Sequence, residues 1–391
     1  MNFNYLKMES NKRSQIFQNN IHSENINEIP VNNSIINYRL KENAHSRSLA
    51  TIPDETKNAF LVGATQKNKC SEIIKVIYDE LNKKLSTQTV LDFNKEKEGE
   101  EKQLINEVNN IYPISSNESL LNIFNSTANK YELKLFDESK IDEYLNISCA
   151  SSEDIFDILI FENKKENIIC TDKNGLKFID LNKDSITEKV DFFKENEIIE
   201  NPMKVSSDVS KLNILGCGLD KNVYLYDLKA KKISHKINSA HDGSVLCFQF
   251  DPISPSIFCT SGSDFALKFW DIRRPETEIG GIYNNSHWIW SLKYNKSYSN
   301  MMVTASSSSL VRGIIFDKYD IGDDKNKNLL DKYSSDKNIK KYSYIDYFEF
   351  EDSVYTIDWL KNDSWTFVAT SFNAYFHVNI IPDEIKYKIM L

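Results

Sequence analysis

The chain has 391 residues and a net charge of −9, and 40% of its residues are hydrophobic. This length permits a large core or several domains, whereas the acidic balance argues against nucleic-acid binding, which normally requires a basic excess. No apolar run approaches the roughly 20 residues of a membrane helix, and the N-terminus MNFNYLKMESNK lacks the apolar core of a signal peptide. We therefore expect a cytoplasmic protein that meets membranes only indirectly, through its partners.

The sequence offers little for catalysis or metal binding. It has no HExxH, GxSxG or P-loop motif and only six histidines. Its six cysteines follow no CxxC spacing, which favours free buried thiols over disulfides or a zinc site. We expect no enzyme activity, no metal and no cofactor. The cysteines are Cys70, Cys149, Cys170, Cys217, Cys247 and Cys259.

Residues 1–34 are rich in Asn, Ser, Glu and Lys, with isolated apolar residues. This composition predicts a disordered tail, and a short docking helix is the alternative. The rest, 35–391, is expected to fold as one domain. Residues 35–50 alternate loosely between apolar and polar side chains, which suggests a strand that closes a ring of sheets. Short strands then follow in groups, which we assign to 59–93, from Val108 onward, 153–190 and 202–237.

A hydrophobic residue followed by Asp recurs at the end of a strand-like run. The five aspartates are spaced by 43, 47, 44 and 46 residues, and propeller blades typically repeat every 40 to 50 residues or so. Five such pairs at this spacing predict a seven-bladed WD-repeat β-propeller, an all-β fold. The aspartates are Asp137, Asp180, Asp227, Asp271 and Asp317.

Residues 238–274, the fifth blade, read as one complete WD repeat. Such repeats often carry a buried relay from a turn carboxylate through a histidine and a strand hydroxyl to a tryptophan. Asp264, His241 and Trp270 fill three of these structural roles. Gly262 occupies the most favourable place for the hydroxyl, so we expect Ser261 or Ser263 to supply it and the relay to be incomplete or displaced.

The sixth blade begins at Asn284 and runs to VRGIIFD. Residues 318–341 break the period and are strongly charged, which predicts a loop insertion. The seventh blade is then expected to comprise SYIDYFEF, DSVYTIDWL, TFVATS and YFHVNII, and EIKYKIML to form a final outer strand. Outside the fifth blade the relay fades: Asn285 and Phe350 stand in place of histidines, and Ser308 in place of an aspartate.

Several segments are more specific than the repeat itself. They are NNSHWIWSLKYN (284–295), EDSVYTIDW (351–359), IKYKIML (385–391), AHDGSVLCFQFDP (240–252) and SGSDFALKFWDIR (261–273), with fainter likeness at 38–50 and 60–66. Together they resemble the WD-repeat family that interacts with the GARP and EARP tethering complexes. The resemblance implies a non-catalytic adaptor, a monomer within a larger complex, located peripherally at the trans-Golgi network and endosomes. It further implies a role in endosome-to-Golgi retrograde transport and endosomal recycling.

Five residues are candidate partner contacts. Trp288, with His287 beside it, precedes the innermost strand of the sixth blade, where side chains tend to lie on the rim of the ring, and Trp290 follows. Exposed tryptophans are favoured interface anchors, and the alternative is packing between blades. Arg312 lies in an apolar strand, where it would line the central channel or pair with a carboxylate.

Arg273 carries the first alternative function. With 257–273 it resembles the box by which some propellers dock on the adaptor of cullin-RING ubiquitin ligases, which would make the protein a substrate receptor; otherwise Arg273 is a solvated charge at a strand end. The second alternative is a histone-binding chromatin propeller, which the acidic charge would suit.

Overall fold

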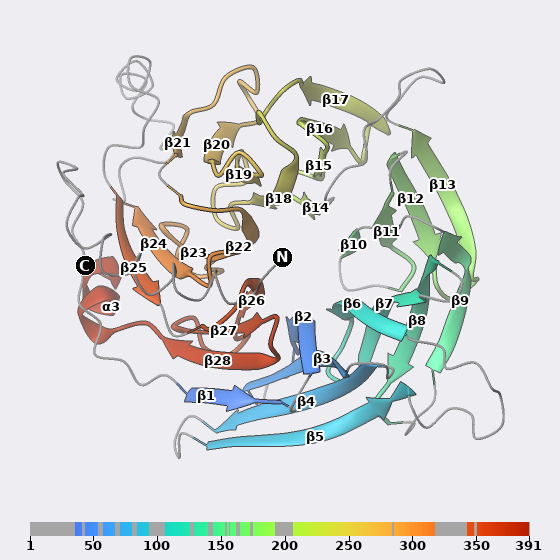
Figure 1. Cartoon of the computed structure of the whole chain (residues 1–391). Coiled ribbons are helices and arrows are strands. Elements are labelled where there is room, and N and C mark those ends of the chain that lie inside the picture. Colours follow the sequence, from blue (N-terminus) through green and yellow to red (C-terminus); the bar gives the residue numbers. More distant parts are fainter. Residues whose placement is uncertain are drawn as a thin grey trace, which may run out of the picture.

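The computed structural model describes residues 36–40, 44–53, 58–66, 71–79, 84–93, 106–125, 129–139, 144–152, 155, 157–161, 165–172, 175–191, 206–283, 285–316, 342–347 and 350–390. Within them the strands form seven four-stranded antiparallel sheets, arranged as a ring with one strand of each sheet nearest the centre (Figure 1). The predicted seven-bladed propeller is confirmed. The expected tail 1–34 and the charged insertion 318–341 lie outside the described residues.

The blades follow the chain in order. From the innermost to the outermost strand, blade one comprises β2 (Ala44–Thr51), β3 (Asn58–Gln66), β4 (Ser71–Asp79) and β5 (Lys84–Asp92). Blade two comprises β6 (Asn106–Pro113), β7 (Glu118–Asn125), β8 (Lys130–Asp137) and β9 (Tyr144–Ser152). Blade three comprises β10 (Asp157–Ile160), β11 (Ile168–Thr171), β12 (Gly175–Asp180) and β13 (Ser185–Asp191).

Blade four comprises β14 (Ser206–Val209), β15 (Ile214–Leu219), β16 (Asn222–Asp227) and β17 (Lys232–Ile237). Blade five comprises β18 (Val245–Phe250), β19 (Ile257–Gly262), β20 (Leu267–Asp271) and β21 (Gly280–Ile282). Blade six comprises β22 (Ile289–Tyr294), β23 (Met301–Ser306), β24 (Val311–Phe316) and β25 (Tyr342–Tyr347). Blade seven comprises β26 (Val354–Trp359), β27 (Thr366–Ser371), β28 (Tyr375–Ile380) and β1 (Ile36–Arg39).

The recurring aspartates have a local physical role. Asp137, Asp180, Asp227 and Asp271 each end the third strand of a blade. Each accepts a hydrogen bond from the backbone N–H two residues later, at 2.8 to 3.0 Å. A short carboxylate that binds its own backbone in this way stabilises the turn toward the outermost strand. The spacing that predicted the fold is therefore the spacing of one kind of turn.

The ring is closed by β1, whose Ile36 pairs with Val378 and Arg39 with Tyr375 of β28. The expectation that 35–50 closes the ring holds only for this short strand, because β2 is the innermost strand of blade one. The segment SYIDYFEF was also misplaced. Its strand β25 pairs with β24 and completes blade six, so the charged insertion falls within a blade.

The C-terminal segment is a helix, α3 (Asp383–Met390), and the predicted outer strand is wrong. The outer edge of β28 is already paired with β1, so the segment that follows β28 cannot pair back on it as the next strand. Ile385 and Ile389, four residues apart on one helix face, are buried in the cluster that joins blades six and seven. Acidic residues in the first turn and Lys388 in the last complement the helix dipole.

Apolar clusters fill the spaces between neighbouring blades. One joins Leu267 and Phe269 of blade five to Leu292 and Phe316 of blade six. Polar bridges join the innermost strands: Asp208 accepts from the N–H of Phe250 at 2.9 Å, and the Gln249 side chain from that of Tyr294 at 2.7 Å. The described cysteines with placed side chains are buried thiols that are not joined in disulfides: Cys170, Cys217, Cys247 and Cys259.

Candidate partner-binding surface

The relay in blade five is complete, contrary to expectation. Nδ1 of His241 lies 2.9 Å from Oδ1 of Asp264, and Nε2 lies 2.8 Å from Oγ1 of Thr260. Nε1 of Trp270 donates to the same hydroxyl at 2.9 Å. Ser261 instead donates to the carbonyl oxygen of Ile289 in blade six, at 3.1 Å. Side chains alternate between the two faces of a strand, so Thr260 lies on the same face of β19 as Gly262, whereas Ser261 points to the other face. Thr260 therefore supplies the hydroxyl.

Gly262 makes room for this relay. A Cβ at this position would lie 2.5 Å from both Nδ1 of His241 and Oδ1 of Asp264. Burial raises the pKa of the Asp264 carboxyl, but the hydrogen bond and electrostatic attraction of His241, together with hydrogen bonds from the N–H groups of Asp242 and Ala266, outweigh it and keep the pKa below its usual value. The relay thus holds the turn between β19 and β20 against the loop that precedes β18.

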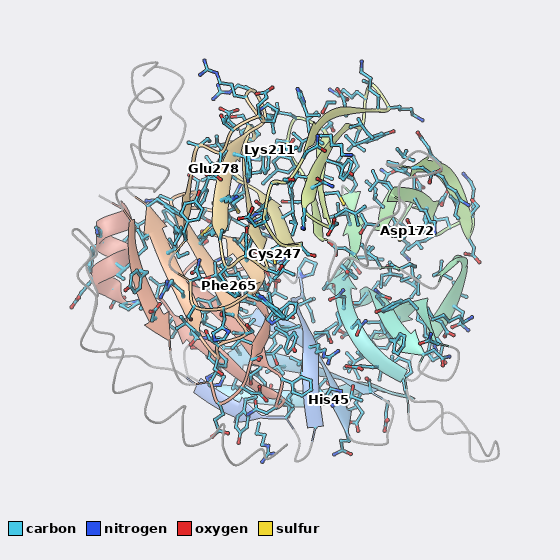
Figure 2. The ribbon with its side chains drawn as sticks, turned by 45° about the horizontal axis from the view of Figure 1, so that its top comes forward. His45, Asp172, Lys211, Cys247, Phe265 and Glu278 are labelled. Atoms are coloured by element: carbon cyan, nitrogen blue, oxygen red, sulfur yellow. The ribbon has the colours of Figure 1, made fainter. Side chains whose placement is uncertain are left out.

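This turn lies on the face where the innermost strands begin, which we call the upper face. There, ring contacts link four blades. Phe265 meets His287 at 6.4 Å between ring centroids, Trp288 meets Trp290 at 5.5 Å, and Trp290 stacks on Tyr355 at 5.5 Å. Tyr355 meets Phe372 at 5.8 Å, which stacks on His45 at 5.2 Å. We call these seven residues, with Arg47, the aromatic band; Figure 2 labels Phe265 and His45 near its two ends.

Three members of the band occupy one structural position. In blades six and seven, a register shift just after the first residue of the innermost strand falls at Trp290 and at Tyr355. In blade one, the shift falls between His45 and Ser48, where Arg47 lies. A β-bulge releases one residue from the ladder and redirects its side chain. Repetition of this bulge around the ring brings the three side chains together.

The band is accessible at its centre and at one end. Trp288, Trp290, Tyr355 and Phe372 are half-buried, and His287 is exposed. Phe265 is 39% exposed and has φ of 66°. A bulky residue with positive φ is an outlier that persists only where the surroundings impose it, and here the relay fixes the adjoining turn.

Basic groups flank the aromatic rings. The guanidinium of Arg47 lies 5.5 Å from the ring centroid of Tyr355 and 5.3 Å from that of Phe372. His45 and Arg47 also approach Glu107 of blade two, at 3.3 and 3.6 Å. The hydrogen bond from His45 lowers the pKa of Glu107, against the opposing effect of burial. The band thus ends in an ion-paired group at the blade one–blade two junction.

The other two predicted contacts lie elsewhere. Arg273 follows the end of β20, on the opposite, lower face. Its guanidinium nitrogens donate hydrogen bonds to the Asp271 carboxylate oxygens at 2.7 to 3.0 Å. Arg312 pairs with Asp346 of β25 at 2.6 and 2.9 Å, and its guanidinium lies 4.2 Å from the ring centroid of Tyr344. Of the two alternatives for Arg312, the carboxylate partner is the one observed.

Sequence reasoning singled out His287, Trp288 and Trp290 but missed Tyr355, Phe372, His45 and Arg47. The sequence offered one signal for Tyr355: it is the second residue of the innermost strand of blade seven, after Val354, just as Trp290 is the second residue of the innermost strand of blade six, after Ile289. Where the relay residues are replaced, other contacts take over. Asn285 donates to the carbonyl oxygens of Phe265 and Ile282, Ser308 bonds Ser306, and Phe350 packs on His377 at 3.9 Å.

Two further features concern the residues that the structure describes. Among the side chains placed there, no group of three or more His, Cys, Asp or Glu is arranged to hold a metal ion. None of the helices found in that part of the chain is long and apolar enough to span a membrane.

Comparison with known proteins places the chain among related propellers. A family model described as the EIPR1 beta-propeller matches residues 33–312. The human EARP and GARP complex-interacting protein 1 is 29% identical over 178 residues, which cover 42% of this chain and 46% of the human protein. The EARP-interacting protein 1 of Caenorhabditis elegans is 23% identical over 184 residues, covering 46% and 50% of the two chains. The chain thus spans about half the length of the curated relatives it matches.

Proposed function

Because the chain belongs to the EIPR1 beta-propeller family, we propose that it is a non-catalytic adaptor that binds subunits of the EARP or GARP tethering complexes. The names of its relatives in human and Caenorhabditis elegans support this proposal. In this proposal the protein acts in endosome-to-Golgi retrograde transport and endosomal recycling. It works as a monomer within a larger assembly, peripherally at the trans-Golgi network and endosomes.

We propose the aromatic band as the surface that binds the tether. The observation that carries this choice is the unbroken set of ring contacts from Trp288 through Trp290 and Tyr355 to Phe372. Large half-buried aromatic side chains held by their neighbours lose little conformational freedom on binding. They therefore serve as interface anchors, and replacing one by alanine often costs 2 kcal/mol or more. His287 and Phe265 extend the same surface toward blade five.

The test is affinity purification of the tagged full-length protein from its native cells, followed by mass spectrometry. Trp288→Ala is compared with Trp365→Ala, a half-buried tryptophan in blade seven that packs on Tyr298 at 4.5 Å, away from the band. We expect the parent and Trp365→Ala to recover tether subunits and Trp288→Ala to recover at least fivefold less, with equal melting temperatures confirming the fold.

Two outcomes would revise the proposal in different ways. Equal recovery of tether subunits with both variants would keep the adaptor function and remove the aromatic band as its surface. Recovery of a cullin scaffold and its adaptor, without tether subunits, would favour the ligase-receptor alternative. That alternative depends on Arg273, whose guanidinium is already bound by Asp271.

A further inference from the structure

The central channel contains a cavity of about 410 Å³. All seven innermost strands contribute to its wall, from β2 to β26. This volume is within the range of roughly 300 to 1,000 Å³ that is usual for small-ligand sites. The cavity extends along the channel, because its lining includes Tyr355 of the aromatic band as well as residues of the turns that follow β22 and β26.

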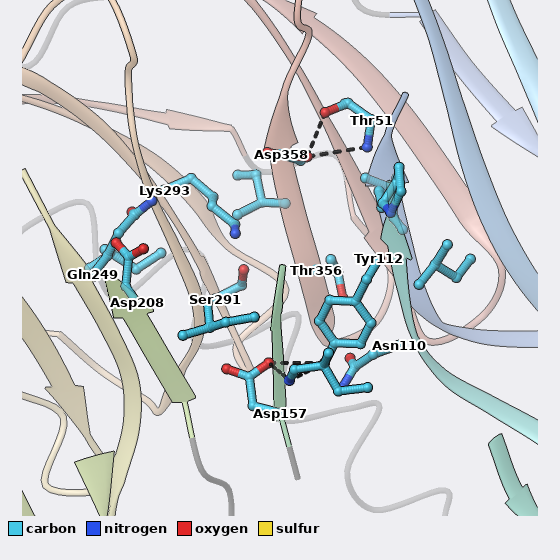
Figure 3. A pocket seen from close by; sticks show the side chains of 18 of the residues that line it. Thr51, Asn110, Tyr112, Asp157, Asp208, Gln249, Ser291, Lys293, Thr356 and Asp358 are labelled. Atoms are coloured by element: carbon cyan, nitrogen blue, oxygen red, sulfur yellow. Dashed lines mark hydrogen bonds between the residues drawn. The ribbon is translucent and has the colours of Figure 1, made fainter. Parts of the chain in front are cut away.

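One position of each innermost strand faces the channel at the same level. In blades five, six and seven it is held by Gln249, Lys293 and Asp358, whose strand partners are Cys259, Val303 and Val368. Gln249 is engaged by the backbone of the next blade. Asp358 is engaged likewise, and accepts from the N–H and hydroxyl of Thr51 at 3.2 and 2.6 Å. Lys293 extends from β22 into the cavity (Figure 3).

Two more lysines line the same cavity. Lys296 and Lys361 stand in equivalent turns of blades six and seven, just after β22 and β26. Lys361 lies 3.9 Å from Asp358. Burial would raise the pKa of the Asp358 carboxyl, but Lys361 and Lys293, together with the bond from Thr51, lower it to about 2. Partial burial and the neighbouring Lys361 lower the pKa of Lys296 to about 8.

The charges in this part of the wall do not balance. Lys293, Lys296 and Lys361 share Asp358, which leaves an excess of two positive charges when all four groups are ionised. Like charges held together in a partly desolvated cavity repel one another, and an anion bound among them would relieve that repulsion.

The carboxylates that line the cavity in blades three and four accept hydrogen bonds from neighbouring groups of the protein. Asp157 accepts from the hydroxyl of Tyr112 at 2.9 Å. Asp208 accepts from the N–H groups of Phe250 and Val209 at 2.9 and 2.8 Å, and burial raises its pKa to about 6. The cavity therefore has an acidic wall in blades three and four and a basic wall in blades six and seven.

We propose that Lys293, Lys296 and Lys361 form a binding site for a phosphate monoester group, carried by a soluble metabolite or by a lipid headgroup. A phosphate monoester carries a charge of about −1.5 to −2 at neutral pH, which matches the excess positive charge of the wall. Lysine ammonium groups bind phosphate as point charges. The proposal does not rest on the tether proposal, because its three lysines lie near the ends of β22 and β26 and in the turns that follow, whereas Trp290 and Tyr355 of the aromatic band lie near the starts of these strands.

The test is isothermal titration of the full-length protein with inositol hexakisphosphate and with inorganic phosphate. Flotation with phosphatidylcholine vesicles, with and without a phosphatidylinositol monophosphate, is run in parallel. The double variant Lys296→Gln, Lys361→Gln is compared with Lys183→Gln, Lys231→Gln, which removes the same charge from ion-paired lysines of blades three and four that are 75% and 66% exposed. We expect the channel variant to weaken binding at least tenfold and the control variant less than twofold.

The arms of the experiment separate the possibilities. Binding of the soluble phosphates alone would identify a metabolite site, and binding of the phosphoinositide vesicles alone a headgroup site. Absence of binding in both arms, or equal loss in the two double variants, would overturn the proposal, as would equally tight binding of a polyglutamate peptide. If the channel variant melts earlier than the parent, Lys296→Arg with Lys361→Arg keeps the charge and must retain binding.

Discussion

Replacing Thr260 by valine tests the relay most directly, because valine keeps the shape of threonine and removes only the hydroxyl. In the parent this oxygen accepts from Nε1 of Trp270 at 2.9 Å and lies 2.8 Å from Nε2 of His241. With the His241 Nδ1 proton directed to Asp264, the hydroxyl donates to Nε2. The substitution therefore leaves one buried donor and one buried acceptor without their shared partner.

The expected loss follows from these two groups. Each buried polar group left unsatisfied costs about 1 to 3 kcal/mol, and the added methyl group returns a fraction of that. We expect a net loss of about 2 to 4 kcal/mol in the free energy of unfolding. For a propeller of roughly 350 residues, this corresponds to a melting temperature lower by about 3 to 5 °C.

Calorimetry of the full-length protein measures the effect, with two controls. Thr304→Val removes a hydroxyl from the equivalent position of β23, where its bond is a single contact of 3.4 Å to the carbonyl oxygen of Arg312. Thr260→Ser keeps the hydroxyl. We expect both to melt within about 2 °C of the parent. If Thr260→Val melted no earlier than Thr304→Val, the relay would contribute nothing to stability and the reasoning would be refuted.

Three further predictions concern stability. Gly262→Ala places a methyl group against His241 and should lower the melting temperature at least as much as Thr260→Val, whereas an unchanged value would show that the relay can shift. Ile385→Ala should cost about 2 to 4 kcal/mol in denaturant unfolding because Ile385 is buried, while Tyr387→Ala, at a residue 64% exposed, should cost little; equal losses would count against helix docking. Burial lowers the pKa of His377 to about 4, so its protonation favours the unfolded chain as pH falls from about 6.5 toward 4. The parent should lose about 2 kcal/mol more than His377→Leu between pH 7 and pH 5, and parallel pH profiles in urea unfolding would contradict this.

The sequence by itself determined the architecture, because the features that repeat depend only on residues close together in the chain. Each hydrophobic–aspartate pair combines a strand end with a side chain that binds its own backbone, as Asp227 and Asp271 do. Such signals need no distant partner, so their period could be counted. The family resemblance was likewise carried by contiguous segments, and His241, Asp264 and Trp270 were assigned from one repeat.

Only the tertiary structure decided which residues meet across blades. The hydroxyl of the relay was assigned to the wrong residue because the face of a strand depends on register, and a shift of one residue exchanges the faces. The C-terminal segment does not continue the sheet beside β28, because β1, more than 330 residues earlier in the chain, already occupies that edge, and the segment instead packs as a helix through Ile385 and Ile389. The aromatic band and the lysine wall of the channel join residues from separate blades, whose distances depend on how the ring closes. Local sequence patterns do not specify distances between residues of different blades. Tyr355, Arg47 and Lys361 could therefore be identified only from the fold.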